Sequence, residues 1–78
     1  MSATRIDATA VDVAMTGDQI VVMLADGRTI AAPLAWSSRL AGATREQRSN
    51  WRLTGRGQGI HWPDVDEDIS VASLLRVA

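Results

Sequence analysis

The residues best suited to chemistry lie in one short stretch, G-I-H-W-P-D-V-D-E-D, at positions 59–68. It holds the single histidine of the chain, His61, and four of the nine acidic residues. These residue types would suit a metal site, a catalytic base with an acidic partner, an acidic contact surface or the start of a helix. The spacing that each kind of site requires decides between these four interpretations.

The aspartates of this stretch superficially match a calcium-binding loop. Asp64, Asp66 and Asp68 have the alternate spacing of the first ligands of an EF-hand. That loop also requires glycine at its sixth position and glutamate at its twelfth, where this chain has Ile69 and Leu75. Without cysteine, and with one histidine, the chain also lacks the nitrogen and sulfur ligands of a zinc site. We therefore expect no metal and no cofactor.

A catalytic role for His61 would require a nucleophile that it can activate. None of the serines lies in a G-x-S-x-G context, and cysteine is absent. The glycine run G-R-G-Q-G at 55–59 is not followed by the Lys-Ser or Lys-Thr of a phosphate-binding loop. The sequence therefore predicts that the protein is not an enzyme.

Two interpretations of the acidic residues remain. Ile60 and Trp62 alternate with His61 as on a short strand that Pro63 ends. The carboxylates would then crowd into the start of the terminal helix, where the helix dipole favours negative charge. They exceed what a helix start needs, so they could also form an acidic surface for a protein partner. This candidate surface consists of Asp64, Asp66, Glu67 and Asp68.

A basic block precedes the acidic stretch. Residues 37–60 contain five arginines against one glutamate, although the whole chain has a net charge of −1. Arg45, Arg48 and Arg52 have i, i+3, i+7 spacing and would form a stripe beside Trp51 if one helix carried them all. Such a stripe could bind phosphates, a partner, or the acidic residues of the chain itself. The acidic total and the single aromatic residue beside the stripe make direct nucleic-acid binding the less favoured alternative.

Three strands are expected within residues 10–33. Val11, Val13 and Met15 alternate with small or polar residues, which predicts a strand with one buried face. The pair at 26–27, Asp-Gly, is a strong signal for a hairpin between the second and third strands.

Helical spacing appears after Pro33. Trp36 and Leu40 lie four apart and predict one apolar face of a helix over residues 35–41. Residues 44–47, T-R-E-Q, form a capping box that would start a second helix, ending at 50 or 51.

The last third combines short strands with a terminal helix. Residues 51–54 and 60–62 are expected as strands on either side of the glycine run. Ser70 would cap a helix whose apolar stripe is Val71, Leu74 and Leu75. The predicted fold is α+β in two layers: an antiparallel β-meander with two or three short helices on one face, in the order βββααβ(β)α.

Residues 1–78 are expected to form one domain, with residues 1–7 as a flexible N-terminus. The longest apolar run, 20–25, is far shorter than the roughly 20 residues of a membrane helix. Asp7 and Asp12 interrupt any apolar core of a signal peptide. We therefore predict a cytoplasmic protein without a membrane partner. So small a core is also compatible with a homodimer.

Three strings carry a resemblance to a known family: D-G-R at 26–28, P-L-A-W-S-S-R-L-A-G-A-T-R-E-Q-R-S-N-W at 33–51, and G-x-G-x-G-I-H-W-P-D-V-D-E-D-I-S-V-A-S-L-L at 55–75. Over residues 8–76 the chain resembles the bacterial domain of unknown function 2442. The resemblance implies a small α+β module that occurs alone, ahead of a helix-turn-helix domain, or in toxin–antitoxin-like pairs. It implies no catalytic residues. It also implies a structural signature, consisting of Trp36, Trp51, His61, Trp62 and Pro63.

These observations predict a small bacterial or phage binding module that acts by occupying the surface of a protein partner. Two forms of this function stay open: an inhibitor of a bacterial defence nucleoprotein complex, like an anti-CRISPR protein, and a toxin-neutralising antitoxin. The alternative is a DNA- or RNA-binding transcriptional regulator that uses the arginine stripe.

Overall fold

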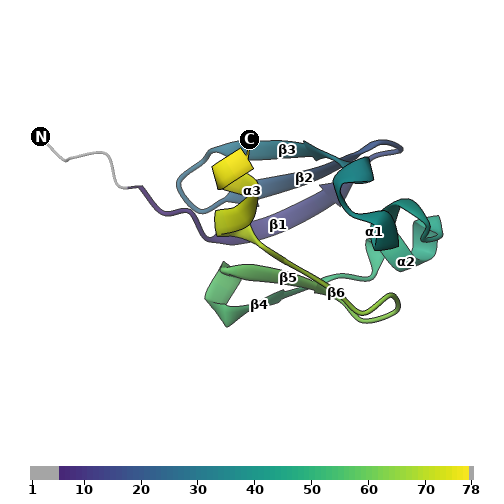
Figure 1. Cartoon of the computed structure of the whole chain (residues 1–78). Helices are drawn as coiled ribbons and strands as arrows, with labels where there is room; N and C mark the ends of the chain where they lie inside the picture. The colour runs from purple at the N-terminus through teal and green to yellow at the C-terminus, as the bar shows by residue number, and fades with distance from the viewer. Residues whose placement is uncertain (1–5, 78) are drawn as a thin grey trace, which may run out of the picture.

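The first half of the chain forms a three-stranded antiparallel sheet. The computed structural model describes residues 6–77, and this sheet consists of β1 (Ala10–Met15), β2 (Gln19–Leu24) and β3 (Thr29–Pro33), in that order (Figure 1). Gly27 has a φ of 92° in the β2–β3 turn, and its amide donates to the carbonyl of Leu24. The predicted hairpin is confirmed.

A bulge changes which side chains of β1 are buried. The register with β2 shifts between Ala10 and Asp12, so the alternation breaks at Val11. Ala10 and Val13 are buried, whereas the side chain of Val11 is 56% exposed. The prediction that Val11 lies on the buried face was therefore wrong, because an inserted residue shifts the face of its neighbours.

Three short helical segments follow the first sheet at one end of the molecule: the 3₁₀ turn η1 (Leu34–Trp36), α1 (Ser38–Ala41) and α2 (Arg45–Ser49). The predicted capping box is present, since Thr44 accepts from the amide of Gln47 and the Gln47 side chain accepts from the amide of Thr44. The predicted helix over 35–41 is instead divided at Ser37, whose hydroxyl caps α1.

The division at Ser37 separates Trp36 from Leu40. Residues three apart in a 3₁₀ turn lie on one side, and here these are the buried Leu34 and Ser37. Leu40 is fully buried, but Trp36 points outward and is 53% exposed. The predicted apolar face shared by Trp36 and Leu40 was therefore wrong.

The remaining strands form a second antiparallel sheet. It consists of β4 (Arg52–Thr54), β5 (Gly59–Trp62) and β6 (Glu67–Ser70), in that order, with the 3₁₀ turn η2 (Gly55–Gly57) between β4 and β5. β4 and β5 were predicted. β6 was not, because its acidic residues were assigned to the start of the terminal helix.

The terminal helix α3 (Val71–Val77) follows β6 directly. The hydroxyl of Ser70 accepts from the amide of Ser73, which confirms the predicted cap. Val71 and Leu74 are buried and Leu75 is half-buried, so the predicted stripe is also confirmed.

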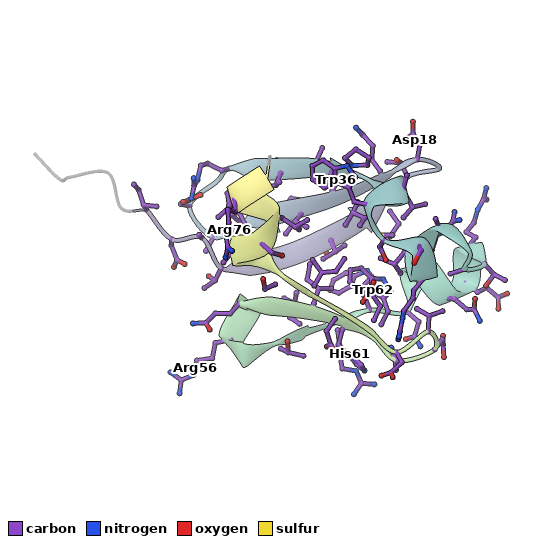
Figure 2. The ribbon with its side chains drawn as sticks, viewed as in Figure 1. Asp18, Trp36, Arg56, His61, Trp62 and Arg76 are labelled. Atoms are coloured by element: carbon purple, nitrogen blue, oxygen red, sulfur yellow. The ribbon has the colours of Figure 1, made fainter. Side chains whose placement is uncertain are left out.

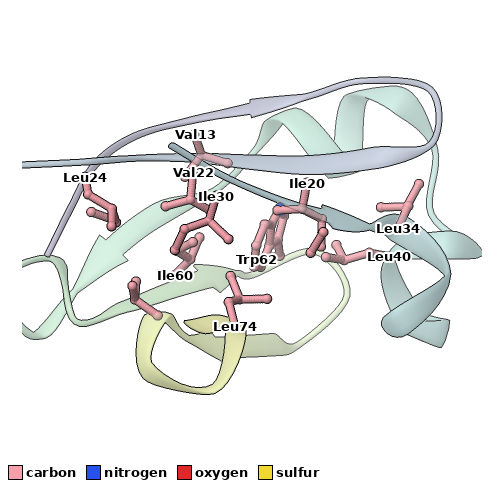
Figure 3. Close-up of a cluster of buried hydrophobic side chains, with 13 residues drawn as sticks. Val13, Ile20, Val22, Leu24, Ile30, Leu34, Leu40, Ile60, Trp62 and Leu74 are labelled. Carbon is pink, nitrogen blue, oxygen red and sulfur yellow. The ribbon is translucent and has the colours of Figure 1, made fainter. Parts of the chain in front are cut away.

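The core lies between the two sheets (Figure 3). Ile20, Val22 and Ile30 contribute from the first sheet, Ile60 and Trp62 from the second, and Leu74 from α3. The predicted α+β class with two layers is confirmed, and the structure adds that the second layer contains a sheet of its own.

Most of the predicted flexible N-terminus, residues 1–5, lies outside the described residues. Within it, Asp7 is described, and its amide donates to the carboxylate of Asp26. Among the described helices, none has the length and apolar content needed to span a lipid bilayer.

Candidate functional site

The four acidic residues lie on the β5–β6 hairpin. Asp64 and Asp66 belong to the turn, and Asp66 has a φ of 53°, which reverses the chain. Glu67 and Asp68 begin β6 and pair with Trp62 and His61 of β5. The four residues thus lie on one hairpin and not at a helix start.

The acidic residues of the turn have few partners. Asp64 accepts a hydrogen bond of 3.0 Å from the side-chain amide of Asn50. The carboxylate of Asp66 is 90% exposed and lies 3.9 Å from the guanidinium of Arg39. That guanidinium donates to the carbonyls of Val65 and Asp66, so its main effect is to hold the turn. Both carboxylates remain open to a partner.

The acidic residues of β6 point to opposite sides of the second sheet. Glu67 accepts a 2.6 Å hydrogen bond from the hydroxyl of Ser37, which connects β6 to the helical segment. Asp68 is 72% exposed, and its carboxylate lies 2.9 Å from Nδ1 of His61. Figure 2 shows His61 on the side of the second sheet that faces away from the first. In that sheet His61 lies beside Arg52 of β4, so three polar residues line up across the strands.

The structure does not form the predicted arginine stripe. Arg45 and Arg48 lie on α2, but this helix ends at Ser49 and Arg52 lies on β4. The guanidinium of Arg48 donates to the carbonyls of Leu40 and Ala41, the last turn of α1. Such carbonyls have no partner within the helix, so Arg48 has a structural role.

A small polar hollow nevertheless lies beside α2. It has a volume of about 310 Å³ and is lined by Arg45, Arg48 and Ser49 together with Thr16 and Gly17 of the β1–β2 turn. This hollow is what remains of the predicted phosphate-contacting surface.

A larger groove lies between the helical segment and β6. Its volume is about 720 Å³, and its lining includes Trp36 and Ser37 on one side and Glu67, Asp68 and Leu74 on the other. The sequence did not indicate this groove, because its walls are far apart along the chain. In the sequence, Trp36 shortly after Pro33 would have been the one indication of this groove.

Three other residues of the predicted structural signature, Trp51, Trp62 and Pro63, lie in the core, against it or at a strand end. Trp62 is fully buried between the sheets (Figure 2), and its indole N–H donates to the carbonyl of Arg48 at 3.0 Å. Trp51 is half-buried against the core, and Pro63 follows the last residue of β5. Across residues 6–77, no three carboxylate or imidazole side chains are placed to share a metal ion.

Residues 10–78 match the family described as protein of unknown function (DUF2442). The chain belongs to this family. The resemblance stated from the sequence strings is thereby confirmed, and it covers nearly the whole chain. A search of the curated proteins finds no match.

Two solved structures are similar to this DUF2442 chain. One is the crystal structure of a protein of unknown function from Rhodospirillum rubrum, with a TM-score of 0.77 and 28% identity over 88% of this chain and 86% of that one. The other is the solution structure of an uncharacterized protein from Chromobacterium violaceum, with a TM-score of 0.75 and 27% identity over 87% of this chain. This chain spans 64% of the Chromobacterium protein.

Proposed function

We propose that this DUF2442 protein is a non-enzymatic, cytoplasmic binding module that blocks or neutralises a protein partner by occupying its surface. The hairpin carboxylates of Asp64, Asp66, Glu67 and Asp68 would contact arginine or lysine side chains of the partner. A basic surface of this kind is expected on a protein that otherwise holds nucleic acid. An inhibitor of a defence nucleoprotein complex, as anti-CRISPR proteins are, and an antitoxin both fit this proposal.

The observation that supports the proposal is the surplus of negative charge on the hairpin. In the described part of the chain, its four carboxylates contact one guanidinium, that of Arg39, and one imidazole, that of His61. The carboxylates of Asp66 and Asp68 are 90% and 72% exposed, so a partner can reach them without unfolding the hairpin. Exposed ion pairs within one chain contribute little to stability, which leaves association as the role in which these charges matter most.

The test compares two variants that lose the same number of charges. The hairpin variant carries Asp64→Asn, Asp66→Asn and Asp68→Asn. The control carries Asp12→Asn, Asp18→Asn and Glu46→Gln, which are exposed residues of β1, the β1–β2 turn and α2. Proteins captured from a bacterial lysate by the wild type and the control, but not by the hairpin variant, are the expected result. Identical capture by all three would contradict the proposal.

A nucleic-acid-binding regulator is the second candidate, and the polar hollow beside α2 favours it. Arg45 and the hydroxyls of Thr16 and Ser49 could contact a phosphate there. The measurement is affinity for duplex DNA as a function of salt, for the wild type and for Arg45→Ala, which removes a cation of the hollow and leaves the Arg48 bonds to α1 in place. A salt-dependent affinity that falls in this variant would support the regulator over the protein-binding module.

A further inference from the structure

The groove beside Trp36 is separate from the turn that carries Asp64 and Asp66. Its lining comes from η1, β6 and α3, together with inward residues of the first sheet, and includes no residue of β5. The groove therefore lies on the side of β6 that β5 does not cover. Its volume of about 720 Å³ falls within the range of roughly 300–1,000 Å³ typical of ligand-binding clefts.

One edge of this groove is the edge of β6, which pairs with no other strand among the described residues. The amide of Val71 donates to the carbonyl of Gln58, and bonded and non-bonded pairs alternate along an antiparallel ladder. The backbone groups of Ile69 therefore face β5, whereas those of Asp68 and Ser70 face outward. The amide of Asp68 is occupied by the Glu67 carboxylate, at 3.0 Å. The carbonyl of Asp68 and the amide of Ser70 are left to meet an added extended segment, the mode of recognition called β-augmentation.

The charge of the lining indicates what such a segment should carry. Two of the described residues that line the groove are charged, Glu67 and Asp68. The Asp68 carboxylate lies against His61 on the other face of the sheet, so Glu67 is the acidic group that faces the groove. The Glu67 carboxylate is held in place, because one oxygen accepts from Ser37 and the other from the amide of Asp68. An ionised carboxylate can accept about four hydrogen bonds, so it retains capacity for a cationic donor.

The opposite side of the groove offers an aromatic face. Trp36 is 53% exposed, while Leu34 and Ser37 on either side of it are buried and fix the turn that carries it. An exposed tryptophan on a fixed turn is suited to anchor a partner, because it offers a large apolar area at little entropic cost. Its ring also attracts an arginine or lysine side chain through cation–π interaction.

We propose that this groove binds an extended segment of a protein partner in which arginine or lysine alternates with apolar residues. The segment would add to the edge of β6, place its cation between Glu67 and the ring of Trp36, and cover the apolar wall at Leu74. A second copy of the chain fits less well. A two-fold contact would bring each Glu67 against the equally acidic groove of the other copy. The inference rests on the proposed protein-binding function and assigns it a binding mode.

The probe is a capped pentapeptide, acetyl-Val-Arg-Val-Arg-Val-amide, titrated into the isotope-labelled protein and followed by nuclear magnetic resonance. We expect saturable shifts of the Trp36 indole N–H and of the backbone amides of Asp68 and Ser70. The same peptide with glutamine in place of arginine should bind at least about 10-fold more weakly, since a charge-assisted hydrogen bond is lost.

Matched variants test the groove. Trp36→Ala and Glu67→Gln should each weaken the arginine peptide about 10-fold, and glutamine at 67 can still bond to Ser37. Glu46→Gln removes one exposed charge of α2, outside both the groove and the hairpin, and should leave the affinity within about twofold. The spectrum of each variant shows independently that it is folded.

Four outcomes would contradict the proposal that the groove binds an extended cationic segment. These are shifts confined to residues 64–66, equal binding of the glutamine peptide, no shifts at millimolar peptide, or the same shifts caused by raising protein concentration alone. The first would leave the acidic hairpin of the proposed function standing. If lysate capture also proved independent of the hairpin charges, the proposed function would fall as well.

Discussion

Trp62 is constrained on both its apolar and its polar side. Its ring is fully buried between the sheets, and its indole N–H donates to the carbonyl of Arg48. Trp62→Phe removes this donor and part of the ring volume, so we expect a loss of roughly 2–4 kcal/mol in the free energy of unfolding. Trp36→Phe, on an exposed ring, should change it by about 0.5 kcal/mol or less. Urea unfolding of both variants measures the contrast, and similar losses would contradict the structure.

Gly57 is fixed by a close approach to the first sheet. Its φ is 87°, and a Cβ atom at this position would lie 2.5 Å from the carbonyl oxygen of Ala10. Gly57→Ala should therefore cost about 2 kcal/mol or more, through left-handed backbone and overpacking together. Gly17→Ala is the matched control, because no atom lies within 4 Å of the added methyl group. Thermal unfolding should show a clear loss for the first variant and little change for the second.

At the scale of elements, the sequence predicted every strand except β6. Glu67, Asp68 and Ser70 leave Ile69 as its one apolar residue, so the alternation that indicates a strand was missing. Acidic residues before a serine cap are also typical of a helix start, and Ser70 does cap α3. The strand forms because the turn at Asp66 returns the chain alongside β5, a pairing that local composition does not specify.

The β2–β3 hairpin contains the carboxylate with the clearest electrostatic role. Asp26 accepts from the Arg28 guanidinium and from the amides of Arg28 and Asp7, which lowers its pKa from 3.8 to about 2. A pKa lowered in the folded state adds stability above about pH 4 that is lost as pH falls toward 2. The stability difference between wild type and Asp26→Asn should therefore shrink across this range.

Chemical unfolding at a series of pH values from 5 to about 2 checks the Asp26 prediction. Arg28→Gln provides a second variant, because the Arg28 side chain is the largest cause of the lowered pKa of Asp26. It should reproduce part of the change. A stability difference for Asp26→Asn that stays constant over this range would show that the carboxylate is not stabilised by its partners.

At the scale of the whole molecule, the sequence could locate the acidic surface but not the groove. Asp64 and Asp66 of the turn and Asp68 of β6 are all exposed, and their residue types alone were sufficient to select them. The groove depends instead on how the helical segment sits against β6, between residues about 30 positions apart, such as Ser37 and Glu67. The exposure of Trp36 has the same origin, because only the break at Ser37 turned it away from Leu40.

The hydrogen bond between Ser37 and Glu67 connects the first half of the chain to the second. Ser37 is buried, donates to Glu67 at 2.6 Å and also accepts from the amide of Leu40. A double-mutant cycle of Ser37→Ala and Glu67→Ala should therefore give a coupling energy of about 1–2 kcal/mol by urea unfolding. The exposed bond between Asn50 and Asp64 is the control, and its alanine cycle should give about 0.5 kcal/mol or less. Equal couplings would mean that the Ser37–Glu67 bond does not hold β6 against the helical segment, and the groove between them would then lack a fixed wall.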